Sequence, residues 1–463
     1  MRLLFVETSR LIAKYALSSV KSITPLKTSS HTPLSTPFRS FLQSFLLRST
    51  VQNQDKRVLV LVFCRGITAL GFSVVFPFLS IYLHNVMRVS MTAIGTVFLA
   101  SSLAGALSAL VGGELSDKFG RKRVMVLALI FRAITFFLIG LAVLKSAGFL
   151  VIAALVVVSS FAGRLFEPAA GAMISDVTAP AKRQEAYALL RIGINLGWAI
   201  GPAIGGFLAS FSYAFLFFAS AIVISIGLVV LLVALKGYRT AGHGERVNLR
   251  DLASVGRDKA FVSYNLVSLL LFLVMAQLMM TLSVYAVDWV GISKIQLGYL
   301  YTVNGLMVVF LQFPCVRLVR GLRMTRVMAL GSFLYAAGYF SAAFAGGFIA
   351  LLLSVIVVTF GEMFTSPPSL ALVSNMAPRE RYGRYMGVFE LFGSVGHSLG
   401  PFVGGIIMDA SAGNRLVLWG FVGIIGLIAT QGFLVIGNRL APGVDSPVRE
   451  VSPSAMTAVP VDS

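Results

Sequence analysis

Long apolar segments, separated by short polar stretches, run through most of the chain. Each segment holds about 20 apolar residues, the length of helix that crosses roughly 30 Å of hydrocarbon. The segments are continuously apolar rather than alternating, which excludes strands, whose unpaired edges cannot face lipid. The pattern predicts twelve membrane-spanning helices, at residues 58–83, 92–111, 123–144, 148–172, 185–209, 212–235, 261–287, 296–316, 326–345, 348–371, 384–408 and 415–437.

Composition supports a fold surrounded by lipid. The 463 residues are 57% hydrophobic and 12% charged, and their mean hydropathy is +0.88. A globular chain in water carries roughly 25% charged residues and cannot hide this much apolar surface. The sequence therefore predicts an all-α polytopic membrane protein.

Lysine and arginine are distributed unevenly between the two sets of loops. If both termini are cytoplasmic, the loops on the opposite side hold only Arg88, Lys145, Lys294 and Arg415. Cationic loops stay cytoplasmic, so we expect a multi-pass protein of the plasma membrane with both termini inside. A basic inner surface that faces the anionic inner leaflet explains most of the net charge of +20, and no nucleic-acid partner is expected.

Composition also divides the chain into parts. The first part is basic and rich in Ser and Thr, which is typical either of a disordered or mis-started leader or of a transit-type peptide. A long polar stretch falls where two halves must join. The predicted parts are an N-terminal extension (1–56), an N-terminal six-helix half (57–237), a cytoplasmic linker (238–259), a C-terminal six-helix half (260–437) and a tail (438–463).

An internal repeat relates the two halves. A Gly-Pro string occurs twice, 199 residues apart. Its shared positions are Gly197, Gly201, Pro202, Gly205 and Gly206 in the first copy and Gly396, Gly400, Pro401, Gly404 and Gly405 in the second. Ser90 and Gly95 also match Ser293 and Gly298, 203 residues on. Such repeats predict two pseudo-symmetric six-helix halves with a cavity between them near the bilayer midplane, as in transporters that rock to alternate access.

The spacing within the Gly-Pro string has a physical meaning. Gly197, Gly201 and Gly205 recur every four residues and open one helix face to close approach by a neighbour. Pro202 removes the hydrogen bond to the carbonyl of Trp198 and bends the helix. Helix packing alone would explain such a ladder, so it indicates transport only together with other motifs.

Two motifs resemble a known family. The segment from Gly113 to Lys122 reads Gly-x-Leu-Ser-Asp-Lys-x-Gly-Arg-Lys and closely resembles the cytoplasmic signature of the major facilitator superfamily. The Gly-Pro string resembles the antiporter signature of that superfamily. Its second copy, with the Arg-Tyr-Met-Gly run at 384–387, is most similar to the twelve-helix drug/proton antiporter group. The resemblance spans the twelve predicted helices, about residues 57–437.

The first motif predicts a conformational latch. Gly113 and Gly120 suit tight turns, and Asp117 suits an exposed helix N-terminus. The resemblance implies that Asp117 caps the start of the eleventh helix across the two halves, and that Arg121 pairs with Asp176 at the end of the fourth. A simple cationic anchor would explain the basic residues but not Asp117 with two glycines. The predicted latch comprises Gly113, Asp117, Gly120, Arg121, Lys122 and Asp176.

Charges inside the membrane are costly and indicate function. Arg164 and Glu167 lie three residues apart on one helical face and can pair, while Pro168 frees the Arg164 carbonyl. The resemblance implies that the first, fourth, seventh and tenth helices line the cavity and that Arg164 is linked to proton coupling. Glu167 and Glu362 are the candidate proton carriers, because burial favours a protonated carboxyl and arginine does not titrate.

Further polar residues complete the predicted pathway. Arg65 begins a helix face that continues through Phe72 and Phe76, which suits a cavity wall, although snorkelling to the inner surface is an alternative. Gln277 lies among methionines that offer an adaptable lining. Arg132 has no assigned role, and His397 is interpreted as a packed, neutral imidazole.

Arg191 and Glu390 occupy equivalent repeat positions, 199 residues apart, about two turns into their helices. We interpret them as residues of gate ion pairs rather than as substrate contacts.

The chain has no nucleotide-binding loop, no Cys or His cluster and no serine elbow. We therefore expect no enzyme, cofactor or metal. The predicted function is secondary active transport, with proton-coupled efflux of small hydrophobic or amphiphilic compounds by a monomer whose partners are a small-molecule substrate, protons and the bilayer. Alternatives are a sugar or metabolite uniporter or symporter of the same fold, a transport-dead receptor, and a membrane-embedded enzyme.

Overall fold

The computed structural model describes residues 54–236, 254–319, 321–378, 381–441 and 443–445. Within these ranges it contains helices and no strand. The first six predicted helices are α4 (Lys56–Ile81) continued by η1 (Tyr82–Val86), α5 (Met91–Phe119), α6 (Arg121–Leu144), α7 (Phe149–Arg164) followed by α8 (Phe166–Val177), α9 (Pro180–Phe211) and α10 (Tyr213–Ala234).

After the short turn η2 (Ser254–Arg257), the remaining helices follow in the predicted order. They are α12 (Lys259–Met275) continued by η3 (Ala276–Leu278), α13 (Thr281–Val284) and η4 (Tyr285–Trp289), then α14 (Lys294–Leu318), α15 (Met324–Ala342), α16 (Phe348–Met376), α17 (Tyr382–Ala410) and α18 (Arg415–Arg439). The all-helical membrane fold predicted from the apolar pattern is confirmed.

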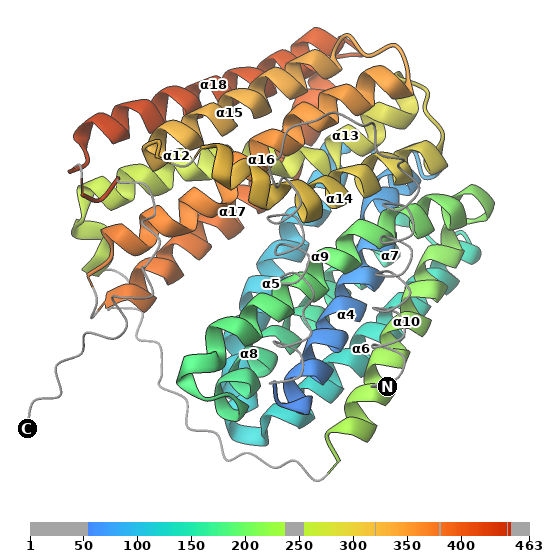
Figure 1. Ribbon diagram of the computed structural model, residues 1–463. Coiled ribbons are helices and arrows are strands. Elements are labelled where there is room, and N and C mark those ends of the chain that lie inside the picture. The colour runs from blue at the N-terminus through green and yellow to red at the C-terminus, as the bar shows by residue number, and fades with distance from the viewer. Residues whose placement is uncertain (1–53, 237–253, 320, 379–380, 442, 446–463) are drawn as a thin grey trace, which may run out of the picture. The chain divides into compact units, whose positions relative to one another are not determined.

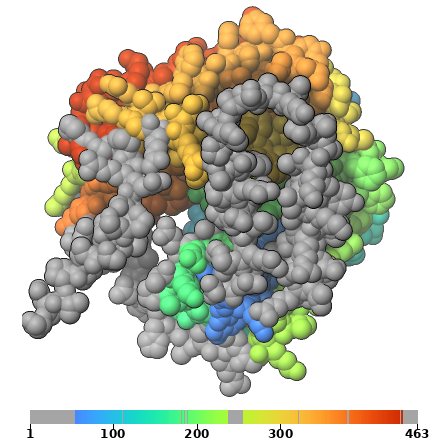
Figure 2. Space-filling model, viewed as in Figure 1, coloured from blue at the N-terminus to red at the C-terminus, as the bar shows by residue number. Residues whose placement is uncertain are grey.

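Eleven helical stretches of the described ranges are long and apolar enough to cross a membrane. The remaining predicted helix is the ninth, α15, which has 19 residues but a less apolar sequence that includes Arg326, Tyr335 and Tyr339. It packs against both α16 and α18, and the orange to red atoms of this part of the chain lie together in the space-filling view (Figure 2). Because protein rather than lipid covers much of α15, it needs fewer apolar residues than its neighbours.

The two halves pack by equivalent contacts. In the first half α4 contacts α9 and α10, and in the second α12 contacts α17 and α18. The first half is drawn blue to green and the second yellow to red (Figure 1). The halves meet through two equivalent helix pairs, α9 with α14 and α5 with α17. The repeated helices therefore carry the contact between the halves.

Local sequence explains where several helices begin or break. Ser90 caps α5 by accepting a hydrogen bond from the Ala93 N–H at 3.3 Å, and Ser293 caps α14 within a capping box. The fourth predicted helix is interrupted at Leu165, three residues before Pro168. The seventh is interrupted at η3, where the sequence has no proline. The predicted extension (to residue 53) and most of the linker (237–253) lie outside the described residues.

Candidate functional site

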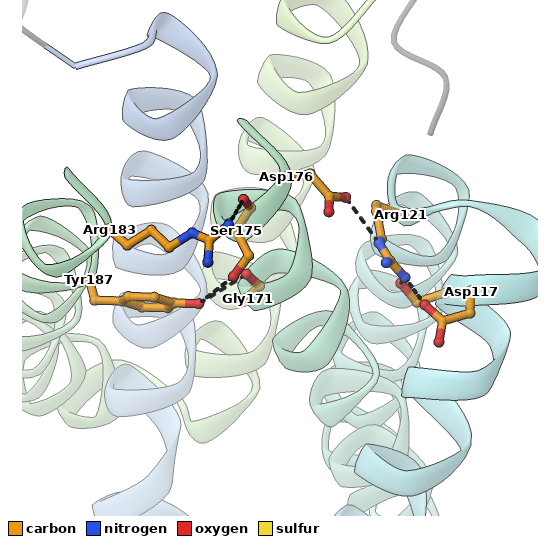
Figure 3. Close-up of polar contacts among 8 residues, drawn as sticks. Asp117, Arg121, Gly171, Ser175, Asp176, Arg183 and Tyr187 are labelled. Atoms are coloured by element: carbon orange, nitrogen blue, oxygen red, sulfur yellow. Dashed lines mark hydrogen bonds and ion pairs between the residues drawn. The ribbon is translucent and has the colours of Figure 1, made fainter. Parts of the chain in front are cut away.

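Three predicted latch residues meet at one end of the helices (Figure 3). The side chain of Arg121 is 5% exposed and forms ion pairs with Asp117, and with Asp176 at 3.3 Å between Nε and Oδ2. Its Nη1 also donates to Ser116 Oγ at 3.1 Å. A buried guanidinium is stable only when its charge is balanced, so the two carboxylates hold the ends of α5 and α8 to the start of α6. We call this end of the protein the latch end.

The turn predicted at Gly113 was wrong, and the cap from Asp117 to the eleventh helix stays a prediction. Asp117 lies in the last turn of α5 rather than at a helix N-terminus, and α17 begins at Tyr382 with no side-chain cap among the described residues. Gly113 lies inside α5, with open space where a Cβ would stand, because the helix continues to Phe119. Gly120, with φ +90°, does make the turn between α5 and α6.

The structure adds latch-end contacts that sequence reasoning missed. Arg183 Nη2 donates to the Ser175 carbonyl at 3.0 Å, and Tyr187 Oη donates to the Gly171 carbonyl at 3.1 Å (Figure 3). Both side chains come from the first turns of α9. Arg183 satisfies a carbonyl of the last turn of α8, which has no following turn to bond it, and Tyr187 adds a second donor to a carbonyl further inside that helix. Lys122, a predicted latch residue, instead donates from Nζ to the Leu235 carbonyl at the end of α10, at 2.7 Å.

The second half balances its own arginine with a residue of the tail. Arg323 Nε donates to Asp445 Oδ2 at 2.9 Å, and Asp445 is fully buried. The same carboxylate accepts from the Thr325 backbone N–H at 2.8 Å and caps the start of α15. Asn375 Nδ2 donates to the neighbouring Val444 carbonyl at 3.0 Å. The sequence analysis placed residue 445 in a tail outside the fold and so missed this contact.

The Gly-Pro strings pack within their own half, as their spacing predicts. A Cβ at Gly197 would stand 2.6 Å from the Gly66 carbonyl oxygen, and one at Gly201 2.9 Å from Ser73 Cβ, so both glycines lie against α4. In the second copy a Cβ at Gly400 would stand 2.5 Å from Ala276 Cβ. These distances are too short for any side chain, so the glycines are required by close approach.

The last glycine of each string reaches the other half. A Cβ at Gly206 would stand 2.5 Å from the Lys294 carbonyl oxygen of α14, and one at Gly405 2.7 Å from the Met91 carbonyl carbon of α5. The repeated glycines of the partner helices pack in return. A Cβ at Gly95 would stand 2.7 Å from the Pro401 carbonyl oxygen, and one at Gly298 would stand 2.5 Å from the Pro202 carbonyl oxygen. The repeat therefore forms both sides of the contact between the halves.

Hydrogen bonds join the halves at the end opposite the latch end. Asp409, in the last turn of α17, accepts from the Met91 N–H at 3.0 Å and the Thr92 N–H at 2.7 Å, and thereby caps α5. Asn85 of η1 bonds to Asp288 of η4. Met91 lies about 40 Å from Asp117 along α5, at 1.5 Å per residue. We call this end the opposite end.

Glu167 lies between two arginines. Its carboxylate oxygens lie 3.0 Å from Arg65 Nη1 and 3.3 Å from Arg164 Nη1. The pairing of Arg164 with Glu167 agrees with their spacing, and Arg65 joins them rather than extending to the surface. One carboxylate thus links α4, α7 and α8.

Glu362 lies in a different environment. It is half-buried on α16, and Asn304 Nδ2 donates to its Oε2 at 3.4 Å and to Thr359 Oγ1 at 2.9 Å. No lysine or arginine in the described residues forms an ion pair with Glu362. The two candidate proton carriers therefore differ in what balances their charge.

Gln277 is not in a pathway. Its side chain is fully buried, and its Nε2 donates to the Leu273 carbonyl at 3.0 Å and to the Gly400 carbonyl at 2.9 Å. The amide is thus occupied in packing between helices, and we withdraw its assignment as cavity lining. Arg191 and Glu390 are exposed, and no ion pair joins them in the described ranges, so their gate role stays a prediction.

A cavity of about 130 Å³ lies within the first half and extends to α17. Phe72 and Phe76 line it, as predicted for their helix face, and His397 contributes from the second half. Arg132, which had no assigned role, also lines this cavity. The only sign of it in the sequence is a charge within an apolar segment.

Comparisons with known proteins agree with this architecture. A model of the Major Facilitator Superfamily matches residues 61–320 and 266–457. The uncharacterized MFS-type transporter YttB of Bacillus subtilis is 28% identical over 80% of this chain and 93% of its own. The multidrug resistance protein MdtH of Yersinia enterocolitica is 25% identical over 79% of this chain and 90% of its own. A POT family transporter solved in complex with 5-aminolevulinic acid superposes with a TM-score of 0.70 at 13% identity, over 82% of this chain and 96% of that one, and shows likeness of fold alone.

Proposed function

Because the chain belongs to the major facilitator superfamily of membrane transporters, we propose that it is a proton-coupled exporter of small hydrophobic or amphiphilic compounds. The similarity to MdtH, whose name records multidrug resistance, supports this class of substrate. The basic loops support a plasma-membrane protein whose latch end is cytoplasmic.

The observation that carries proton coupling is the difference between the two membrane carboxyls. Glu167 is bridged by two arginines at 3.0 and 3.3 Å and is stabilised as an anion. Glu362 has an amide partner and forms no ion pair in the described residues, so that only the more distant charge of Arg191 acts on it. A carboxylate without a cation in a low-dielectric site favours taking up a proton. We therefore assign proton transfer to Glu362 and ion pairing to Glu167.

The transport cycle follows from these roles. With the halves joined at the opposite end, substrate enters from the latch end. A proton that binds Glu362 from outside neutralises its charge and is released inside when the halves rock back. Rocking occurs about the two equivalent helix pairs, α9 with α14 and α5 with α17, whose repeated glycines allow close approach.

The test is flux in proteoliposomes with an imposed pH gradient. Three fluorescent amphiphiles of different charge serve as probes: ethidium, N-phenyl-1-naphthylamine and 8-anilinonaphthalene-1-sulfonate. Wild type should move at least one of them uphill. Glu362→Gln should abolish uphill transport but keep exchange, because the amide mimics the protonated carboxyl. Glu167→Gln, the matched control, should be less stable yet still coupled.

Two results would contradict the proposal. Uphill transport by Glu362→Gln at the wild-type rate would remove Glu362 from the coupling. Flux that is independent of the pH gradient would instead support a uniporter of the same fold.

A further inference from the structure

The cavity of the first half contains an arginine without a partner. Arg132 extends from α6 into this cavity, and its Nε is buried with no hydrogen-bond partner. No carboxylate in the described part of the chain forms an ion pair with it. Its guanidinium contacts two aromatic rings, with Cζ 5.3 Å from the Phe72 centroid and 5.6 Å from the Phe136 centroid. Such cation–π contacts offset part of the cost of a desolvated charge.

The neighbouring helix is shaped around this guanidinium. A Cβ at Gly163 of α7 would stand 2.6 Å from Arg132 Cζ, so a larger residue would displace the group. The glycine leaves the guanidinium a defined place beside the cavity. An arginine that merely snorkelled to the surface would not need such a place.

The rest of the cavity wall is polar where it approaches Arg132. Ser101 is 7% exposed, and its Oγ is buried with no hydrogen-bond partner. Ser102, Ser159 and Ser160 also line the cavity, together with Arg164. Buried polar atoms without partners are rare in proteins and call for a ligand or water. These polar side chains line the same small cavity as Arg132.

The charge around this space is unbalanced. Of the three arginines Arg65, Arg132 and Arg164, the first and the third form ion pairs with Glu167, and Arg132 forms none in the described residues. The planar guanidinium binds carboxylate and related oxyanions through paired N–H donors. The observed excess of positive charge and free donors therefore fits an anion.

We propose that this cavity binds the anionic group of an amphiphilic organic anion, with Arg132 as its principal partner and Ser101 as a second donor. A space of about 130 Å³ accommodates a headgroup but not a whole drug-sized molecule, whose pockets span about 300–1,000 Å³. The apolar body extends along Phe72 and Phe76 towards His397 of the other half. This assignment specifies the substrate class of the proposed exporter. Binding of the anion does not depend on the proposed function, whereas its transport does.

Equilibrium binding tests the site without a pH gradient. The probes are 2-naphthoate and its uncharged isostere 2-naphthamide, titrated calorimetrically into the purified protein in neutral detergent. Wild type should bind 2-naphthoate about tenfold or more tightly than the amide. Arg132→Gln should bind both equally. Lys145→Gln, which removes an exposed charge outside the cavity, should keep the wild-type preference.

A second variant retains the charge and changes its place. Gly163→Ala should displace the guanidinium and reduce the preference for 2-naphthoate, although Arg132 is still present. Thermal unfolding and size exclusion establish that each variant is folded. Equal binding of the two probes by wild type would overturn the proposal and leave the aromatic rings as the only partners of Arg132. A preference for 2-naphthoate that persists in folded Arg132→Gln would also overturn the proposal.

Repeating the titration in nanodiscs distinguishes soluble ligands from lipid. If 2-naphthoate binds equally in phosphatidylcholine and phosphatidylglycerol nanodiscs, the ligand is a soluble anion. If phosphatidylglycerol abolishes the binding, the cavity holds a lipid headgroup and the proposal is overturned. Intact binding by a protein that shows no gradient-driven flux would contradict the proposed function but not this site.

Discussion

Arginines in or near the membrane of this protein differ in how their charge is balanced. Arg121 is 5% exposed and has two carboxylates, whereas Arg164 is 60% exposed and shares one. Sequence spacing anticipates pairs within one helix, such as Arg164 with Glu167. Sequence spacing cannot anticipate the pair of Arg65 with Glu167, because these residues are 102 positions apart and meet only through helix packing.

Asp117→Asn tests the latch at the residue scale. The substitution removes one of two charges that balance buried Arg121, so transport should fall at least tenfold while the protein still inserts. Initial flux in proteoliposomes, normalised to inserted protein, measures the effect. Exchanging the charges of Arg121 and Asp176 should restore part of the activity lost by either single change. Full activity of Asp117→Asn would refute the latch.

Asp445→Ala tests the counterpart in the second half. Removing this buried carboxylate leaves the Thr325 N–H unpaired and Arg323 without its balancing charge, although its bond to the Gly437 carbonyl remains, so unfolding should become easier by about 3 kcal/mol. The shift in unfolding midpoint measures it. Glu390→Gln, at an exposed site without an ion pair in the described residues, should change stability by less than about 0.5 kcal/mol. An unchanged midpoint for Asp445→Ala would show that the tail contributes nothing.

At the scale of elements, the apolar pattern predicts most of the helices, but the sequence predicts only some of the breaks within them. Pro168 signals the interruption at Leu165, but the break at η3 has no proline. Gly-Pro spacing indicates close packing, yet it does not specify the neighbour. That Gly206 and Gly405 face the other half depends on tertiary contacts that no local pattern encodes.

Asp409→Ala tests the cap between α17 and α5. Loss of two backbone hydrogen bonds should cost about 1 kcal/mol and allow the opposite end to open more often. Labelling of a single cysteine introduced beside Thr92, in a chain without Cys64 and Cys315, should accelerate. The control is Ser210→Ala at the equivalent repeat position, where the hydroxyl bonds only within α9. Equal labelling rates in both variants would contradict a role for Asp409 in closing this end.

At the scale of the whole molecule, the repeat predicts two related halves but not which of their ends are joined. Pseudo-symmetry permits contact at either end, and the difference between the two states is a small balance of many contacts. In this structure the repeated glycines, the Asp409 cap and the Asn85–Asp288 bond join the opposite end. Proton binding at Glu362 is the event that we expect to shift this balance.

The most direct test of proton-coupled rocking is a pair of distances measured by spin labels in one protein at two pH values. Cysteines at positions 145 and 416 report the opposite end, and cysteines at 118 and 439 report the latch end. On acidification the first distance should shorten as the second lengthens, because the protonated carrier rocks back towards the inside, and Glu362→Gln should show the acidic distances already at neutral pH. Distances that do not change with pH while the labelled protein still transports, or that change in the same direction at both ends, would contradict the account.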